Sequence, residues 1–176
     1  MLPVAAEAPA HGPSAPVDAR HLRSALGRFT TGVTIVTCVD DVGTRVGLTA
    51  NSFNSLSLEP PLVLWSLRRE SPSADAFSAA RRFAINVLAE SQLALSRHFA
   101  SRKVDRFDQG DWSAGEHGSP VLAGAVAVFE CETLSTQEAG DHLLFIGRVL
   151  GCNSIAVPPL LFQAGHYRAL GDVLHP

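Results

Sequence analysis

The sequence has little of what marks several common classes of protein. Only three of its 176 residues are cysteines, at positions 38, 131 and 152, and no two form a Cys-x-x-Cys pair. An odd number of widely spaced cysteines is a poor basis for a disulfide framework, so we expect a reducing, cytoplasmic location. All three lie in apolar segments typical of strands, where cysteine usually behaves as a small buried hydrophobe.

An excess of charge of one sign is also missing. The formal net charge is −3, from 14 basic and 17 acidic residues. No basic stripe points to nucleic acid, and no segment is apolar for long enough to span a bilayer, so neither partner is expected. The first 17 residues are rich in Ala and Pro, and they lack both a basic start and an unbroken apolar stretch. We interpret 1–17 as a disordered leader and 18–176 as one domain.

The best-known catalytic and cofactor motifs are absent as well. No Gly-x-Gly-x-x-Gly follows a strand, no phosphate-binding P-loop occurs, and Gly-x-Ser-x-Gly is not found. Paired cysteines and His-Glu-x-x-His are missing too, and the histidines at 98, 117, 142 and 166 lack ligand spacing. We therefore expect no metal site, assign no catalytic nucleophile or base, and expect any nicotinamide nucleotide to bind in a non-classical way.

What the sequence does contain is a series of short strand patterns. Residues 33–39 and 45–49, joined by a turn at 40–43, predict a hairpin. A helix is expected to begin at Asp18, with Leu22, Ala25, Leu26 and Phe29 on one face. Further strands are expected at 62–67, 83–88, 125–133 and 142–152, short helices after Ser71 and Ser91, and a loop over 101–120. The pattern predicts a mainly β protein, a barrel with peripheral helices.

Two polar segments at strand ends are candidate binding sites. Residues 47–53 (GLTANSF) end a strand in small and hydroxyl-bearing residues, which present backbone N–H groups and hydroxyls to an anion or a polar ring edge. Residues 66–72 (SLRRESP) run from a strand into a helix start, a place where anions bind. Taken alone, an ordinary turn and an ordinary helix cap explain these two segments better.

Two further segments carry charge or a histidine. Residues 99–107 (FASRKVDRF) contain basic side chains that can hold a phosphate. A solvated run of charge is the alternative, and the flanking aromatic residues slightly favour the site. Residues 139–142 (AGDH) place a histidine beside a turn, where it can stack on a ligand ring or bond to it. A lone histidine is more often structural, so this segment is also weak in isolation.

Together and in this order, these segments resemble the flavin reductase family with the FMN-binding split barrel. The resemblance runs through LRSALGRFTTGVTIVT at 22–37, GLTANSF at 47–53, SLEPPLV at 57–63, FAINVL at 83–88 and GDH at 140–142. Many members of this family are the small reductase components of two-component flavin monooxygenases. The resemblance covers nearly the whole chain after the leader.

The resemblance implies a split β-barrel that forms a homodimer, with the flavin near the subunit interface. It implies hydride transfer from NADH or NADPH to FMN or FAD, and delivery of the reduced flavin to a separate monooxygenase. The implied flavin contacts are Thr49, Ala50, Asn51 and Ser52, with polar contacts from Ser66, Ser71 and Asn86, and with Ser101 and Arg102 near the phosphate. His142 is implied to contact the nicotinamide, and Asp141 to position it.

Two other functions remain open at this stage. A split barrel can also hold flavin or haem without turnover, as a carrier or sensor, because fold does not fix function. The Gly-Asp-His segment speaks against this option, since a carrier needs no nicotinamide contact. A pyridoxine-type oxidase would need a basic cluster for a second phosphate, and no such cluster is clear. Tyr167 and Arg168 either fold over the ligand or pack elsewhere.

Overall fold

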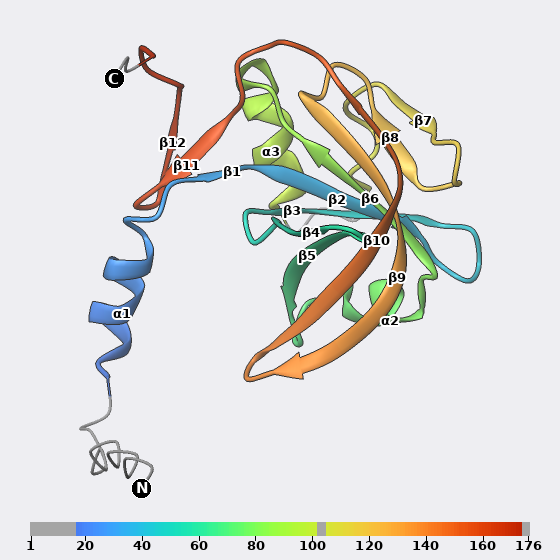
Figure 1. Cartoon of the computed structure of the whole chain (residues 1–176), viewed down its shortest axis with the longest axis horizontal. Helices are drawn as coiled ribbons and strands as arrows, with labels where there is room; N and C mark the ends of the chain where they lie inside the picture. The colour runs from blue at the N-terminus through green and yellow to red at the C-terminus, as the bar shows by residue number, and fades with distance from the viewer. Residues whose placement is uncertain (1–16, 102–104, 174–176) are drawn as a thin grey trace, which may run out of the picture.

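The structure, a computed structural model, describes residues 17–101 and 105–173 and consists mainly of strands (Figure 1). The helices are α1 (Ala19–Leu26), α2 (Ala74–Ala79), the 3₁₀ turn η1 (Glu90–Gln92) and α3 (Leu93–Phe99). The strands are β1 (Thr31–Gly32), β2 (Thr34–Val39), β3 (Arg45–Ala50), β4 (Asn54–Leu58), β5 (Pro61–Arg68), β6 (Arg82–Val87), β7 (Trp112–Ala114), β8 (Pro120–Leu122), β9 (Ala127–Ala139), β10 (His142–Ser154), β11 (Leu161–Gln163) and β12 (His166–Arg168).

One seven-stranded antiparallel sheet forms the body of the molecule, in the order β3-β2-β6-β9-β10-β5-β4. The sheet curls, and the turn from β3 into β4 brings its two ends together. There the Ser52 hydroxyl donates to the Ser66 carbonyl at 2.8 Å and accepts from the Ser66 N–H at 3.0 Å. A smaller sheet, β1-β11-β12, and the hairpin β7-β8 lie beside this barrel.

The barrel interior holds a cluster of aromatic rings. Trp65 on β5 is fully buried. Its ring stacks on that of Phe145 of β10, with 4.5 Å between the ring centroids, and lies edge-on to that of Phe77 of α2, with 4.9 Å between the centroids. Alternate residues of β5 point inward, as the period of two in a strand requires. A second buried cluster, around Phe99 and Leu88, packs α3 against the other side of the sheet. Burial of such large rings is the main contribution to holding α2 and α3 on the barrel.

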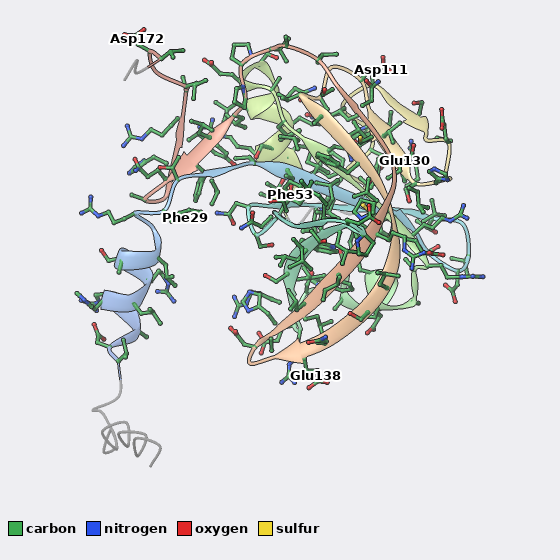
Figure 2. The ribbon with its side chains drawn as sticks, in the orientation of Figure 1. Phe29, Phe53, Asp111, Glu130, Glu138 and Asp172 are labelled. Atoms are coloured by element: carbon green, nitrogen blue, oxygen red, sulfur yellow. The ribbon has the colours of Figure 1, made fainter. Side chains whose placement is uncertain are left out.

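Most of the expected elements are found. Asp18 caps α1, and its carboxylate accepts from the His21 N–H at 2.9 Å. The hairpin β2–β3 forms as expected, and β9 and β10 are joined at Gly140, whose φ of +63° suits glycine. The expected apolar face of α1 is present but not buried. The helix stands away from the barrel (Figure 1), and Phe29, labelled in Figure 2, is 71% exposed.

Several expectations about local structure are wrong. The loop expected over 101–120 contains β7 and reaches β8, and β4 was not predicted. Both β4 and β7 are short and largely exposed, so they lack the apolar alternation that predicts a strand. Ser73, not Ser71, is the residue before α2, and Ser91 lies inside η1 instead of capping a helix. Cys152 is exposed, whereas Cys38 and Cys131 are buried.

The expected leader lies almost wholly outside the described residues, since only residue 17 of the range 1–17 is described. In the part of the chain that the structure describes, no helix combines the length and apolar character needed to cross a membrane.

Candidate functional site

A cavity of about 530 Å³ opens where the ends of β3 and β5 meet the first residue of β10 and the last turn of α3. It is lined by Leu48, Thr49, Ala50, Asn51, Ser52, Ser66, Leu67, Arg68, Glu70, Ser71, Phe99, Ala100, Arg106 and His142. Seven of the eleven residues expected in a nucleotide site therefore line one cavity. They come from three segments that are far apart in the sequence.

Hydroxyl groups on the β3 side of the cavity are already engaged within the protein. The Thr49 hydroxyl donates to the Ser96 carbonyl of α3 at 2.7 Å. The Ser52 hydroxyl exchanges two hydrogen bonds with the backbone of Ser66. These bonds fasten β3 to α3 and β5, so this wall offers a ligand mainly the backbone groups of 49–52.

His142 stands at the opposite wall, at the start of β10. Its Nδ1 lies 2.7 Å from an Asp141 carboxylate oxygen. The hydrogen bond from His142, and then its charge, hold the pKa of Asp141 below the ordinary value. Because Asp141 engages Nδ1, Nε2 is the nitrogen of this half-buried ring that remains for a ligand.

The third wall is the end of α3 and the loop after it. Phe99 and Ala100 contribute their side chains, and the Arg106 guanidinium donates to the Gly47 carbonyl at 2.7 Å and to the Ser101 carbonyl at 2.9 Å. The sequence identified the basic segment 99–107 but did not single out Phe99 or Arg106. Because the loop carrying Arg106 folds back onto β3, only the tertiary contact reveals its role.

Of the other four expected residues, three do not line this cavity and one lies outside the described residues. Asn86 is fully buried, and its carboxamide donates to the Ile35 carbonyl and accepts from the Leu122 N–H, so the structure places it in the core. Asp141 sits beside the cavity, behind His142. Ser101 lines a neighbouring hollow, and its hydroxyl donates to the His98 carbonyl at 2.7 Å. Residue 102, the expected Arg102, lies outside the described residues.

The structure also places Tyr167 and Arg168, whose role the sequence did not decide. The Tyr167 hydroxyl lies 3.0 Å from the Ser96 hydroxyl, and its ring packs on Phe162 at 5.4 Å. Arg168 is exposed on β12. Neither lines the cavity. Tyr167 therefore ties the small sheet to α3, the helix that forms one wall of the cavity.

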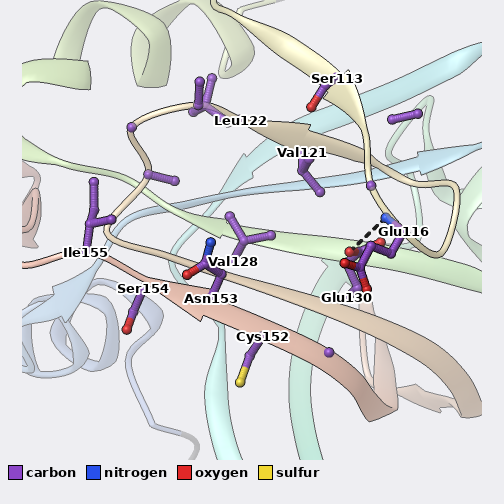
Figure 3. A pocket seen from close by; sticks show the side chains of 16 residues that line it. Ser113, Glu116, Val121, Leu122, Val128, Glu130, Cys152, Asn153, Ser154 and Ile155 are labelled. Atoms are coloured by element: carbon purple, nitrogen blue, oxygen red, sulfur yellow. Dashed lines mark hydrogen bonds between the residues drawn. The ribbon is translucent and has the colours of Figure 1, made fainter.

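A second hollow, of about 460 Å³, lies between the β7–β8 hairpin and the distal ends of β9 and β10 (Figure 3). The Glu130 carboxylate there accepts from the N–H groups of Glu116 and His117, at 3.1 and 2.8 Å. None of the ten expected site residues that the structure describes lines it. Among the described residues, no group of three or more His, Cys, Asp and Glu side chains is arranged to hold a metal.

The cavity between β3, β5, β10 and α3 fits a flavin chemically. Its backbone amides and half-buried histidine suit the polar edge of a ring, its apolar side chains Leu48, Leu67 and Phe99 suit the ring faces, and Arg106 supplies positive charge for a phosphate. A volume of about 530 Å³ is in the range of ordinary ligand pockets.

Comparison with known proteins agrees with this geometry. Residues 26–171 match the family model described as "Flavin reductase like domain". "FMN reductase (NADH) SmoA" from Agrobacterium fabrum is 45% identical over 150 residues, which is 85% of each protein. The "Flavin-dependent monooxygenase, reductase subunit HsaB" of Mycobacterium tuberculosis is 42% identical over 161 residues, 89% of this chain and 85% of that one.

Length and solved structures add two findings. The chain spans about half the length of a "Probable flavin reductase" from Rhizobium meliloti, matching 48% of that protein at 45% identity. The structure of the Streptomyces globisporus NADH:FAD oxidoreductase SgcE6, in complex with NAD and FAD fragments, superposes with a TM-score of 0.83 at 40% identity, covering 90% of this chain and 98% of that one. The family match and these structural neighbours confirm the expected resemblance and the split-barrel fold. This chain belongs to the flavin reductase family.

Proposed function

We propose that this chain is an NAD(P)H-dependent flavin reductase, which binds FMN or FAD in the cavity between β3, β5, β10 and α3 and reduces it. A bound flavin supplies the redox chemistry, since it accepts the hydride that the nicotinamide gives up. The protein has to bind the two rings, orient them face to face and limit the access of water. The sequence predicted a flavin reductase, and similar proteins are named as an FMN reductase and an NADH:FAD oxidoreductase.

One observation supports this proposal more than any other. The strand end 49–52, expected to hold the flavin, and His142, expected to meet the nicotinamide, line the same cavity although some 90 residues separate them. The backbone of 49–52 offers polar groups to one ring, and the His142 ring, held by Asp141 through Nδ1, lines the same cavity for a second. Hydride transfer needs two rings held face to face, which binding groups on two sides of one cavity can provide. It needs no acid or base from the protein.

Delivery of the reduced flavin to a separate monooxygenase belongs to the same proposal. Relatives named as reductase subunits of flavin-dependent monooxygenases, from Mycobacterium tuberculosis and Rhodococcus jostii, support it. The barrel also takes up nearly all of the described residues, which leaves no second domain in that part of the chain for oxygenation of an organic substrate.

We also propose a homodimer and a cytoplasmic location. In a single copy Leu22 and Leu26 of α1 and Phe29, which follows the helix, are exposed. An apolar groove of about 1000 Å³ separates α1 from the barrel. A second copy of the chain is the simplest occupant of that groove, because exposed apolar patches of this kind mark interfaces. The free thiols of Cys38, Cys131 and Cys152 support a reducing location.

The test is aerobic oxidation of NADH by the purified protein, with no flavin, with FMN and with FAD, and with NADPH as a parallel donor. Rates that rise and saturate with added flavin support the reductase and identify its preferred flavin and donor. Tight flavin binding with no rate in any combination would replace the reductase by the carrier or sensor function.

A further inference from the structure

Tyr167 connects the small sheet to the rest of the molecule. It is half-buried on β12 and does not line the proposed flavin cavity. Its ring packs on that of Phe162 of the neighbouring strand β11, with 5.4 Å between the ring centroids. Its hydroxyl reaches out of the small sheet and lies 3.0 Å from the Ser96 hydroxyl of α3. The small sheet therefore contacts α3 through a defined hydrogen bond.

Ser96, at the centre of α3, is fully buried. A buried hydroxyl needs a hydrogen-bond partner, because an unpaired one costs free energy. In the part of the chain that the structure describes, the Tyr167 hydroxyl is the partner of the Ser96 side chain. The guanidinium of Arg97, the next residue of the helix, also lies over the Tyr167 ring, at 5.6 Å from its centroid. Tyr167 therefore holds two consecutive residues of α3.

The backbone of Ser96 is bonded to the wall of the proposed flavin cavity. The Thr49 hydroxyl of β3 donates to the Ser96 carbonyl at 2.7 Å. Thr49 lines the cavity on the β3 side, and Phe99 and Ala100, in the last turn of α3, line it on the helix side. The separation of α3 and β3 therefore sets the width of the cavity. Ser96 fixes this separation, with one bond from the small sheet and one from the cavity wall.

We propose that Tyr167 is a positioning residue for flavin binding, which acts through Ser96 and Thr49 without touching the ligand. Its hydroxyl holds α3 from the side of the small sheet, so that Phe99 and the backbone of 49–52 keep the spacing that a flavin ring needs. This inference rests on the proposed function, since it places the flavin in this cavity. Because the effect is on the space for the ring, it should be equal for FMN and for riboflavin, which lacks the phosphate.

The test is a titration of FMN and of riboflavin, without NADH, into the wild type and into Tyr167→Phe, Thr49→Val and the double variant. Tyr167→Phe removes only the hydroxyl and keeps the ring that packs on Phe162. The matched control is Thr133→Val, because the Thr133 hydroxyl of β9 donates to the Ala80 carbonyl at 3.0 Å and does not line the cavity. Quenching of flavin fluorescence reports binding, and urea unfolding reports stability.

Tyr167→Phe should raise the dissociation constants of FMN and riboflavin by the same factor, about three- to tenfold, which corresponds to one neutral hydrogen bond. In NADH oxidation, KM for flavin should rise by that factor, while kcat at saturating flavin stays near the wild-type value. Thr133→Val should lower the free energy of unfolding by an amount comparable to that of Tyr167→Phe, and it should bind both flavins as the wild type does.

The double variant tests the path from Tyr167 to the cavity. Thr49→Val alone should weaken both flavins. The double variant should bind within about twofold of the weaker single variant, because both substitutions break the same path through Ser96. Two independent sites would instead give effects that multiply. This difference separates a positioning role from a contribution to stability alone.

Three results would overturn the inference while the reductase proposal stands. An unchanged flavin affinity in Tyr167→Phe would leave Tyr167 a packing residue only. Equal losses of affinity in Tyr167→Phe and Thr133→Val would make the effect a general consequence of lower stability. Effects of Tyr167→Phe and Thr49→Val that multiply in full would exclude the path through Ser96. If Tyr167→Phe does not fold, the same comparison in Ser96→Ala, which removes the same bond from the helix side, decides. A wild-type protein that binds neither flavin would instead contradict the proposed function.

Discussion

Several polar side chains that were expected to bind a ligand form hydrogen bonds within the protein instead. The Thr49 hydroxyl is bonded to α3 and the Ser52 hydroxyl to β5, so both act as ties between walls of the cavity. Asn86 occupies the core, between the Ile35 carbonyl and the Leu122 N–H. Residue type suggested ligand contacts for Thr49 and Ser52, and the family resemblance implied one for Asn86. A hydroxyl or amide looks the same in sequence whether its partner is internal or external.

His142 gives the first prediction at this scale. The substitution His142→Ala removes an imidazole ring that lines the cavity but leaves the backbone wall at 49–52 in place. We expect kcat/KM for NADH to fall about tenfold, the value of one lost hydrogen bond, with the flavin dissociation constant little changed. Steady-state kinetics and flavin titration check this, and equal losses in both would contradict the role assigned to His142.

The Asp141–His142 pair gives a prediction about pH. Because His142 holds the pKa of Asp141 below its ordinary value, the pair is complete above the unfolded-state pKa of Asp141 and is lost as pH falls through the folded-state value. In His142→Ala the pKa of Asp141 should rise towards the ordinary value. A carboxyl NMR titration of both proteins measures it, and the same midpoint in both would show that His142 is not the cause.

Asn86 gives a prediction about stability. Asn86→Ala removes the carboxamide that donates to the Ile35 carbonyl and leaves the buried Leu122 N–H without its acceptor, so the free energy of unfolding should fall by about 1–3 kcal/mol. Flavin affinity at a temperature where the protein is folded should stay near the wild-type value. Urea unfolding and flavin titration test both parts, with the exposed Asn153→Ala as a matched control. A large loss of flavin affinity with unchanged stability would return Asn86 to the binding site.

At the scale of elements, the site depends on how closely α3 and its loop approach β3. Gly47 lies beneath the rings of Phe99 and Phe107, where an added Cβ would come within 2.8 and 3.1 Å of ring atoms. Its carbonyl also accepts from Arg106. A side chain at this position of β3 would hold the third wall of the cavity away from the other two.

Gly47→Ala should therefore loosen the cavity. The ring of Phe99 must shift to admit a methyl group, at a cost of roughly 1–3 kcal/mol in the free energy of unfolding, and flavin should bind more weakly. Gly32→Ala is the matched control, because an added Cβ there meets nothing within 4 Å. Thermal unfolding and flavin titration compare the two, and indistinguishable variants would show that the contact between β3 and α3 adapts freely.

At the scale of the whole molecule, α1 and the barrel leave an apolar groove open. The helix has no buried residue, although Leu22 and Leu26 lie on it and Phe29 follows it. Burial of apolar surface is what normally holds an amphipathic helix in place. A lone copy of the chain does not provide that burial, so association with a second copy is expected.

Replacement of Leu26 by Asp should shift the protein towards the monomer. The carboxylate would have to be buried in the interface, whereas it is solvated in a free subunit. Size-exclusion chromatography with light scattering measures the mass, and circular dichroism checks that the barrel is intact. Val42→Asp, at an exposed turn away from α1, is the control. A wild-type protein that is already monomeric at micromolar concentration would contradict the proposed dimer.

The sequence alone determined the class of fold and the family. Runs of alternating and β-branched residues predicted the main strands, and turn residues such as Gly140 predicted a hairpin. Five motifs in order showed the family resemblance. All of these signals lie in short segments of the chain, so they can be recognised without the structure. Short exposed strands such as β4 and β7 were missed, since a strand with little burial has no strong alternation of apolar residues.

Only the tertiary structure decided which polar groups reach the cavity. Arg106 lines the cavity because it is hydrogen-bonded to Gly47 of β3. Asn86 does not line it, because its side chain is buried on the core side of β6. Both outcomes depend on contacts between residues about 35 to 60 positions apart, which no local pattern encodes. Local propensity therefore set the elements, and long-range packing and hydrogen bonding set the site.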